Sequence, residues 1–374
     1  MTHAEIDFDV FRDPGLKADA HARLAELREA SPPVVWTPRN GGHWVVFDRE
    51  ALETVLTDAE HFSSSRLSVN PETPSVPMIP LSLDPPAHAP YRNLLLSHLG
   101  PREVRKLEPF VRAWAERLIT PLAGRASCEF IAEVAAPLPV SVFMDMMGLP
   151  LERRDEFRGY ALTAISSSDD TARAGAHQQI VMALAQLIGE RRAAPRGDLI
   201  SALVSDQIDG RPLADHELMS ICFLLFLAGL DTVTNAMAFG MRHLAADPDL
   251  QAKIRADRSE IPAMVERLLK TYTFVNTVRV ATGDVDLAGT PIKAGEALMC
   301  VLWTGSVAQE GARHMAFGYG PHTCLGMHLA RLELRVLYEV WLDTVASVSL
   351  APGQTFSMHS GNVMGLEKLE LLLG

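Results

Sequence analysis

The segment of residues 215–246 constrains the fold more than any other part of the sequence. Its 32 residues carry helical patterning and end at Asp247-Pro248, so a continuous helix would be about 48 Å long. Its first half is apolar nearly all round, which is typical of a helix through the centre of a domain. The longest apolar run, residues 221–230, stops at Asp231 and is too short to span a bilayer. The pattern therefore predicts a buried central helix.

Helical patterning also dominates the rest of the chain. A hairpin is predicted near the N-terminus, where two apolar runs, 34–37 and 43–47, flank a loop that contains Asn40-Gly41. Residues 63–80 lack periodicity and predict a long loop. These patterns indicate an α+β class that is mainly α. The further predicted helices are 49–59, 102–122, 151–165, 171–194, 262–272 and 327–346, and the further predicted strands are 284–287 and 297–302.

Composition and charge narrow the classes of function. The chain has 374 residues, of which 48% are hydrophobic, and a formal net charge of −12. That charge argues against a nucleic-acid binder held by phosphate contacts. The four cysteines form no C-x-x-C pair and are too few for a disulfide scaffold. The acidic start of the chain lacks the apolar stretch of a secretory signal. We expect a cytoplasmic protein that binds neither nucleic acid nor membrane.

Cys324 has surroundings unlike those of the other cysteines. A lone cysteine is usually a buried core residue, but here Gly318, Gly320 and Gly326 remove side chains near it. A helix is predicted to begin at Met327, and the free N–H groups and dipole of a helix N-terminus favour a thiolate over a thiol. A thiolate on a loop without bulky side chains suits one face of a flat metal macrocycle.

The same stretch resembles the haem-binding loop of the cytochrome P-450 superfamily, whose pattern is F-x-x-G-x-x-x-C-x-G. All four fixed positions match, at Phe317, Gly320, Cys324 and Gly326. The resemblance covers nearly the whole chain and is strongest to the soluble bacterial branch. It implies haem b (iron protoporphyrin IX) as the cofactor, with Cys324 as the axial thiolate. It also implies that Phe317, Gly318 and Gly326 contact the haem.

The resemblance implies the cytochrome P-450 fold, a triangular helical prism with a small β-rich side. In this fold the haem lies between the helix after the cysteine loop and the long central helix. We expect residues 1–374 to form a single domain of this kind. Its β-rich part would comprise residues 30–60, 280–302 and the C-terminal strands, and its helical part residues 85–275 and 325–346.

Ala228-Gly-Leu-Asp-Thr232 lies midway along the predicted central helix. Its small residues would suit helix contacts, and its Asp-Thr pair could bond locally. An acid and a hydroxyl inside an apolar helix are costly, however, unless they have a function. The stretch resembles the family's oxygen-activation motif, A-G-x-D/E-T. The resemblance implies that Ala228 contacts the haem, that Thr232 bonds the bound oxygen and that Asp231 relays protons to it.

A second polar segment, Asp84-Pro-Pro-Ala-His-Ala-Pro-Tyr-Arg92, resembles the bacterial D-P-P-x-H-x-x-x-R segment. His88 and Arg92 are four residues apart and share a helix face. They are either a solvated polar face or, as the resemblance implies, a pair that grips a haem propionate. Arg279 and His314 resemble the family's other propionate donors.

Two features depart from the family pattern. Arg267 and Lys270 stand where the family carries the Glu and Arg of its E-x-x-R motif, and lysine lacks the planar guanidinium of arginine. Glu266 and Lys270 keep the spacing of an i, i+4 ion pair. The connection of residues 303–314 is also much shorter than the family's meander. We expect this protein to bind haem with a looser proximal face than its relatives.

The sequence contains no flavin or dinucleotide fingerprint, so electrons must come from a separate donor, which the resemblance implies is a ferredoxin or flavodoxin. Five basic residues form either a solvated face or a docking patch for an acidic donor: Arg102, Arg105, Lys106, Arg331 and Arg335. A mostly apolar set is predicted either to line the pocket of a small or medium lipophilic substrate or to pack in the core: Met78, Ile79, Leu224, Leu227, Phe274, Val275, Asn276, Val363 and Met364.

Three functions are compatible with these residues. The first is a monooxygenase that oxidises a lipophilic molecule with O₂ and two electrons, in natural-product biosynthesis or catabolism. The second is an atypical haem-thiolate enzyme that couples, cyclises or rearranges its substrate, or uses peroxide, and the altered E-x-x-R motif favours it. The third is a non-catalytic member that recruits or stabilises another enzyme. The intact Cys324, Asp231 and Thr232 favour oxygen chemistry.

Overall fold

The computed structural model describes residues 4–72, 77–167 and 169–374. The chain divides into two compact units. The first, the sheet unit, comprises Met1–Ala89, Leu269–Cys324 and Ser357–Met364. The second, the helical unit, comprises Pro90–Leu268, Leu325–Phe356 and Gly365–Gly374. The predicted loop of residues 63–80 lies partly outside the described residues.

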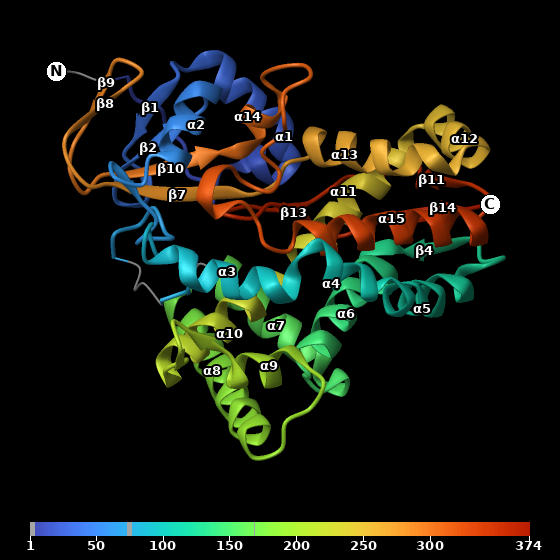
Figure 1. Cartoon of the computed structure of the whole chain (residues 1–374). Helices are drawn as coiled ribbons and strands as arrows, with labels where there is room; N and C mark the ends of the chain where they lie inside the picture. The colour runs from blue at the N-terminus through green and yellow to red at the C-terminus, as the bar shows by residue number, and fades with distance from the viewer. Residues whose placement is uncertain (1–3, 73–76, 168) are drawn as a thin grey trace. The chain divides into compact units, whose positions relative to one another are not determined.

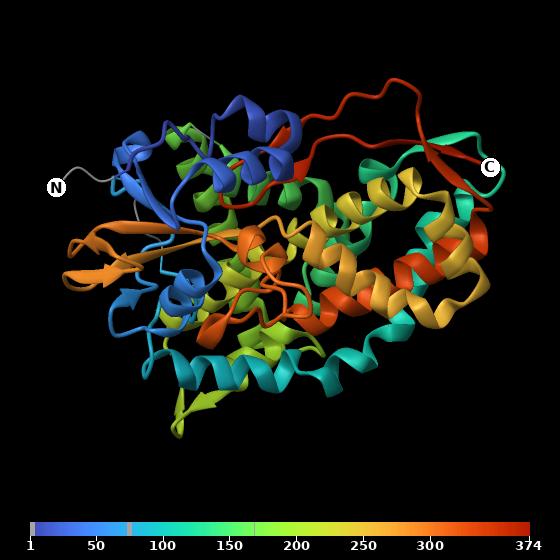
Figure 2. The same cartoon turned by 90° about the horizontal axis from the view of Figure 1, so that it is seen from above.

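The sheet unit is built on a five-stranded mixed sheet of order β1-β2-β10-β7-β3 (Figure 1). The predicted hairpin is confirmed, because β1 and β2 pair antiparallel, whereas β2 and β10 run parallel. The separate hairpin β8–β9 (orange in Figure 2) projects from this sheet. The elements are α1 (Pro14–Ala30), β1 (Val34–Thr37), β2 (His43–Val46), α2 (Arg49–Thr57), β3 (Phe62–Ser63), β7 (Asn276–Ala281), β8 (Val285–Leu287), β9 (Thr290–Ile292), β10 (Ala297–Val301), α14 (Leu302–Val307) and β12 (Met358–His359).

The helical unit holds most of the helices and a three-stranded sheet of order β11-β14-β4. The mainly α class predicted from the sequence is confirmed. Its helices are α3 (His88–Leu99), α4 (Pro101–Lys106), α5 (Glu108–Ile119), α6 (Pro137–Met147), α7 (Arg154–Ser166), α8 (Asp170–Ala193), α9 (Leu199–Ser205), α10 (Asp215–Gly229), α11 (Thr232–Ala246), α12 (Pro248–Ala256), α13 (Ile261–Thr271) and α15 (Met327–Thr344). Its strands are β4 (Ser127–Glu129), β5 (Gln207–Ile208), β6 (Arg211–Pro212), β11 (Val348–Leu350), β13 (Gly365–Leu366) and β14 (Glu370–Leu373).

The prediction of one continuous helix over residues 215–246 is wrong at its centre. The segment forms α10 and α11, separated by Leu230 and Asp231, and Asp231 has φ −141° and ψ −29°, which is not helical. The Thr232 hydroxyl donates to the Ala228 carbonyl oxygen at 3.0 Å, so a side chain replaces a backbone bond where the helix opens. The whole segment is long and apolar enough to cross a membrane, yet 67% of its most apolar window is buried inside the protein.

Two further differences from the predicted elements have local causes. The predicted helix of residues 102–122 is divided at Leu107, because Pro109 has no N–H and its ring excludes a continuous helix through this point. Helix α1 was not predicted, because alanines dilute its apolar periodicity. Its start signal is nevertheless present, since Asp13 accepts hydrogen bonds from the N–H groups of Gly15 and Leu16.

Glu333 is a carboxyl in the core of the helical unit. Its side chain lies on α15, the residue is 1% exposed, and its Oε1 has no hydrogen-bond partner among the described residues. Burial raises the pKa of this carboxyl from 4.5 to about 8. The native state therefore holds a proton that the unfolded state releases at lower pH, and the free energy of unfolding falls as the pH rises through this window.

We predict that Glu333→Gln removes this pH dependence, because the amide cannot ionise. The Tm of the variant minus that of the wild type should increase by several degrees between about pH 5 and about pH 8. Thermal unfolding at several pH values measures this difference. The exposed Glu116 on α5 supplies the control, since Glu116→Gln should track the wild type. A Tm difference that does not change with pH contradicts the prediction.

Candidate functional site

The loop that carries Cys324 is a tight turn within the sheet unit. The Cys324 N–H donates to the Phe317 carbonyl at 2.8 Å, which closes the loop. Gly318 and Gly320 have φ values of +74° and +71°, a region that only glycine adopts readily. The Thr323 hydroxyl donates to the Gly320 carbonyl at 2.8 Å and fixes the last turn. The loop thus holds Cys324 in a defined position through its own hydrogen bonds and two left-handed glycines.

Cys324 differs from the other cysteines in its exposure. All four are thiols, but Cys324 is exposed, whereas Cys128, Cys222 and Cys300 are buried. Burial raises the pKa of each buried thiol to about 12. A reactive or metal-binding cysteine must reach the thiolate form and be accessible. Cys324 is therefore the candidate ligand on structural as well as sequence grounds.

The cysteine loop packs against the C-terminal end of α2. A Cβ atom at Gly320 would lie 2.5 Å from the Leu56 carbonyl oxygen and 3.0 Å from Cγ2 of Thr57. The contact with the Leu56 carbonyl is closer than real Cβ atoms show and is with backbone, which cannot move aside easily, and the contact with Thr57 is tight. Gly320 is thus required by space as well as by its backbone conformation.

His88 belongs to a cluster of polar groups in the sheet unit. It is buried, and its ring lies 4.4 Å from the ring of His322, centroid to centroid. His322 Nε2 lies 3.0 Å from Ser64 Oγ, and Asp84 accepts hydrogen bonds from the Ser64 N–H and the Ser63 hydroxyl. His322 was not among the site residues predicted from the sequence. Its place two residues before Cys324, inside the glycine-rich loop, was the signal that would have found it.

Arg279 is a cation buried in the sheet, on β7. Only 3% of the residue is exposed, and the guanidinium donates to two neutral acceptors, the Val278 carbonyl at 2.8 Å and the Thr277 hydroxyl at 3.3 Å. Burial lowers its pKa. No carboxylate among the described residues forms an ion pair with it. A buried charge without a counter-ion is costly, so this position suits an anion supplied by a ligand.

The other two predicted anion-binding residues are Arg92 and His314. His88 is the first residue of α3, and Arg92 stands one turn later on the same helix. His314 is partly exposed in the sheet unit, where its Nδ1 accepts from the Ala316 N–H at 3.2 Å and its ring lies 6.0 Å from that of Phe317. The role assigned to each stays a prediction.

In the helical unit, α10 and α11 present an open stripe at intervals of four residues. Leu224 is partly exposed, Ala228 is exposed and Thr232 is partly exposed, although most neighbouring positions are buried. Behind Gly229, the Phe143 ring occupies the space that a Cβ would fill. Positions four apart share a helix face, so one small-residue face of this otherwise buried segment is left uncovered by the unit itself.

Asp231 lies at the break between α10 and α11 and is buried. Its Oδ2 accepts from Asn235 Nδ2 at 2.9 Å, and its Oδ1 lies 3.8 Å from a guanidinium nitrogen of Arg158 on α7. Arg158 is partly exposed, whereas the Asp231 side chain is 5% exposed. The carboxylate therefore links Asn235 on α11 with a partly exposed cation on α7, at the residue that precedes Thr232.

The predicted pocket residues near the chain end fall on two faces. Val275 and Val363 pair across an antiparallel bridge, so their side chains share a face and are partly exposed. The adjacent residues alternate to the other side, where Phe274, Asn276 and Met364 are buried. This alternation makes Val275 and Val363 the lining candidates and favours core packing for the other three. Leu227 and Ile79 are also buried, whereas Met78 and Leu224 are partly exposed.

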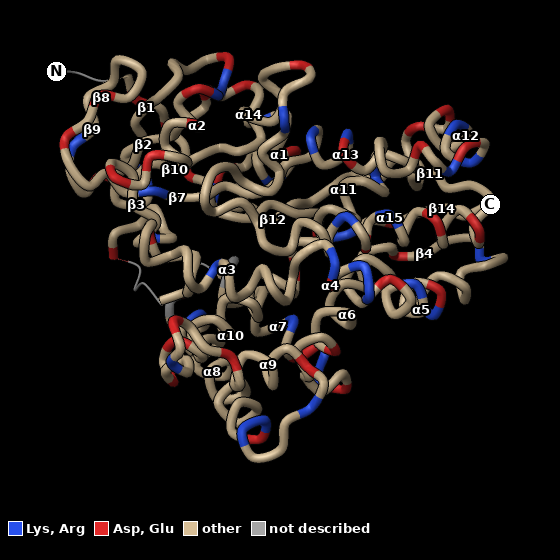
Figure 3. The backbone as a smooth tube through the Cα atoms, in the orientation of Figure 1, with Lys and Arg blue, Asp and Glu red and all other residues tan. Residues whose placement is uncertain are grey.

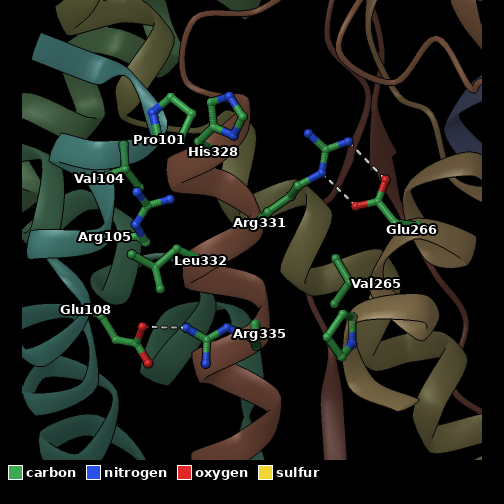
Figure 4. A pocket seen from close by; sticks show the side chains of 11 residues that line it. Pro101, Val104, Arg105, Glu108, Val265, Glu266, His328, Arg331, Leu332 and Arg335 are labelled. Carbon is green, nitrogen blue, oxygen red and sulfur yellow. Dashed lines mark hydrogen bonds and ion pairs between the residues drawn. The ribbon is translucent and has the colours of Figure 1, made fainter. Parts of the chain in front are cut away.

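A groove of about 310 Å³ lies between α4, α5, α13 and α15 (Figure 4). Two ion pairs flank α15: Arg335 with Glu108 at 2.7 Å, and Arg331 with Glu266 at 2.6 Å. Val104, Val265 and Leu332 form its apolar lining, and Pro101, Arg105, Pro262 and His328 complete it. Glu266 therefore forms an ion pair with Arg331 on α15, whereas its spacing in the sequence had indicated Lys270 as a partner.

The comparisons with known proteins agree with this geometry. The sequence model of the family described as cytochrome P-450 matches residues 155–310 and 304–345. A probable cytochrome P-450 127A1 of Sinorhizobium fredii is 33% identical over 97% of this chain and 93% of its own. The chain belongs to the cytochrome P-450 family. It is therefore an oxidoreductase of the haem-thiolate class.

Named relatives of this P-450 include two enzymes with stated reactions. A steroid C26-monooxygenase of Mycobacterium tuberculosis is 30% identical and covers 100% of this chain and 98% of its own. Nocardicin C N-oxygenase of Nocardia uniformis is 31% identical over 97% of this chain and 98% of its own. Among solved structures, cytochrome P-450 CYP101C1 has a TM-score of 0.91 at 31% identity and covers 100% of this chain and 98% of its own.

The residues of this P-450 fit the family's haem iron. Among the described residues, no group of three or more His, Cys, Asp or Glu side chains could hold a metal ion. A single exposed thiol at Cys324 fits a metal whose other ligands come from a porphyrin. Buried Arg279 forms no ion pair with the carboxylates that the structure describes, and a guanidinium in that position suits a propionate.

We predict that Gly320→Ala destabilises this P-450 by about 2 kcal/mol more than Gly353→Ala does. Both glycines have φ +71°, but nothing lies within 4 Å of a Cβ at Gly353, whereas a Cβ at Gly320 meets the end of α2. The pair therefore separates crowding from backbone strain. Urea unfolding measures the two free energies, and equal losses would show that the packing on α2 is unimportant.

Proposed function

We propose that this P-450 is a monooxygenase that inserts one oxygen atom of O₂ into a small or medium lipophilic molecule with two electrons from a separate donor. The observation that carries the proposal is Cys324, the one exposed thiol among four, on a loop closed by its own N–H bond to Phe317. We place the reaction in secondary metabolism or catabolism and the protein in the cytoplasm, where thiols stay reduced.

The cofactor would be haem b, whose iron the Cys324 thiolate would hold, and Phe317, Gly318 and Gly326 would be its further contacts in and after the same loop. Such a cofactor would supply the activation of O₂, and the Cys324 thiolate would contribute electron density to it. The cations that would hold the propionates are His88, His322, Arg92, Arg279 and His314. His322 joins this set because its ring stands against that of His88, and Arg279 because it is a buried cation without a protein counter-ion.

The chain's own proton path would run through the helix break. Thr232 holds a proton at Oγ1, which it now donates to the Ala228 carbonyl. Asp231 accepts from Asn235 and lies near Arg158, so its carboxylate is kept oriented between the interior and solvent. The proposed path depends on the break in the helix. There the Thr232 hydroxyl makes a side-chain hydrogen bond to the Ala228 carbonyl, which it can exchange for another acceptor.

We propose that the substrate site is apolar. The lining candidates that keep partial exposure are Leu224, Val275, Val363 and Met78, and none of them ionises. Such a surface selects by shape and burial of carbon rather than by charge. The named relatives act on molecules of different classes, so the proposal of a lipophilic substrate rests on the apolar lining candidates.

We further propose that the proximal side differs from the family pattern. Lys270, which stands at the arginine position of E-x-x-R, donates to the Gln309 carbonyl at 3.0 Å in the shortened connection. Arg267 is exposed. One ammonium bond to one carbonyl replaces the two-pronged contact that arginine makes, which supports a looser proximal face.

The electron donor would be an acidic ferredoxin or flavodoxin that docks near the groove of Figure 4. The five-residue basic patch is largely neutralised, because Lys106 pairs with Glu103, Arg331 with Glu266, and Arg335 with Glu108. Figure 3 likewise shows acidic and basic positions side by side on α5. Arg102 and Arg105 form no ion pair with any described residue, so docking would depend on these two.

The function is tested by Cys324→Ala, which should abolish the red-shifted thiolate band of the ferrous–CO difference spectrum. Cys222→Ala is the matched control, because Cys222 is buried and should leave the band intact. With a surrogate donor, the wild type should yield a product heavier by one oxygen atom. A wild-type protein without the thiolate band, or a product that has only lost hydrogen, contradicts the proposal.

Charge reversal at Arg105 tests the docking face. We expect Arg105→Glu to slow reduction by a ferredoxin about tenfold at low salt and less at high salt, because the attraction is screened. Arg154→Glu on α7, where Arg154 pairs with the adjacent Asp155, is the control and should leave the rate unchanged. An unchanged rate for Arg105→Glu, measured by stopped flow, would exclude this face.

A further inference from the structure

Arg49 is the first residue of α2 and links three parts of the sheet unit. Its Nη1 donates to the Gly305 carbonyl at 2.5 Å, and its Nη2 donates to the Arg313 carbonyl at 3.1 Å. The same guanidinium pairs with Glu53 at 2.8 Å, and only 13% of the side chain is exposed. One planar cation thus joins two carbonyls that lie eight residues apart in the chain.

The Gly305 carbonyl lies in α14, just before the connection to the cysteine loop, and the Arg313 carbonyl lies near the end of that connection. The ends are also joined by Ser306, whose Oγ accepts from the Met315 N–H at 2.8 Å and donates to the Leu302 carbonyl at 3.0 Å. Gly305 allows Met315 to approach, because a Cβ there would lie 2.4 Å from the Met315 sulfur. Residues 305–315 therefore form a loop closed at its base, and the chain leaves that base directly into Phe317.

Helix α2 connects this base with the cysteine loop. Its first residue, Arg49, holds the base of the connection, and its last turn, at Leu56 and Thr57, abuts Gly320. A nine-residue helix is a rigid element about 13 Å long. The position at which the chain enters the cysteine loop and the surface against which the loop rests are therefore fixed by one helix.

We propose that Arg49 is a positioning residue for Cys324, which sets the cysteine loop through the carbonyls of Gly305 and Arg313. This inference rests on the proposed haem-thiolate function. Arginine suits the role because its fork bonds two carbonyls at once, whereas lysine offers a single point charge. Lys270 makes one contact with the same connection, at Gln309, and so holds its middle but not its base.

The test compares Arg49→Gln and Arg49→Lys with Arg39→Gln in the holoenzyme. Arg39 is a matched control in the same unit, since it is more exposed and pairs with Asp7. We expect Arg49→Gln to lose haem to apomyoglobin about tenfold faster than the wild type, because charged hydrogen bonds are lost. Part of its ferrous–CO spectrum should move to the blue-shifted band of a lost thiolate. Arg49→Lys should be intermediate, and Arg39→Gln should match the wild type.

Amide hydrogen exchange of residues 305–315 provides a readout that does not depend on activity. Faster exchange there in Arg49→Gln, together with the spectral change, supports the proposal. A variant that loses only thermal stability, with the thiolate band and the haem-loss rate unchanged, overturns it. If Arg49→Gln does not fold, the test rests on Arg49→Lys. The proposal is overturned if Arg49→Lys loses haem and exchanges the amides of residues 305–315 at the wild-type rates. A wild type without the thiolate band would instead refute the haem-thiolate function itself.

Discussion

An exposed thiol held rigidly by its own backbone is the constraint on which the rest of the sheet unit depends. Exposure alone would leave Cys324 on a loose loop, and burial would raise its pKa as it does for Cys128, Cys222 and Cys300. The cysteine loop keeps Cys324 both exposed and ordered, because two left-handed glycines set its turn and the Cys324 N–H bonds to the Phe317 carbonyl. The order of the loop then comes from its support on α2, whose end excludes any side chain at Gly320.

The same unit buries a guanidinium and packs two imidazole rings together near the cysteine loop. Arg279 is surrounded by neutral acceptors, and His88 is buried against His322. Removing a guanidinium from water without a counter-ion costs several kcal/mol, by the order of magnitude known for buried charges. An anionic cofactor bound beside Arg279, as we propose, would remove that penalty and would thereby link cofactor binding to the folding of this unit.

The helical unit departs from regular structure where the family carries its oxygen chemistry. A continuous buried helix over residues 215–246 would satisfy its backbone internally, yet the helix opens at Leu230 and Asp231, and a hydroxyl takes the place of one backbone donor. Local rules tend to fail at functional sites, because function there outweighs the stability that regular structure provides. The exposed face at Ala228 lies directly before this break, where Ala228 and Gly229 have small side chains or none.

The sequence by itself determined the family and the class of fold. The spacing of Phe317, Gly320, Cys324 and Gly326 is local, and helical periodicity is a property of single segments, so both can be read without a structure. The tertiary structure decided which residues act together: His322 with His88, Arg331 with Glu266, and Arg49 with two carbonyls of a distant connection. It also assigned Val275 and Asn276 to opposite faces. These pairings depend on contacts between residues far apart in the chain, and their geometry is set by packing, which no local pattern encodes.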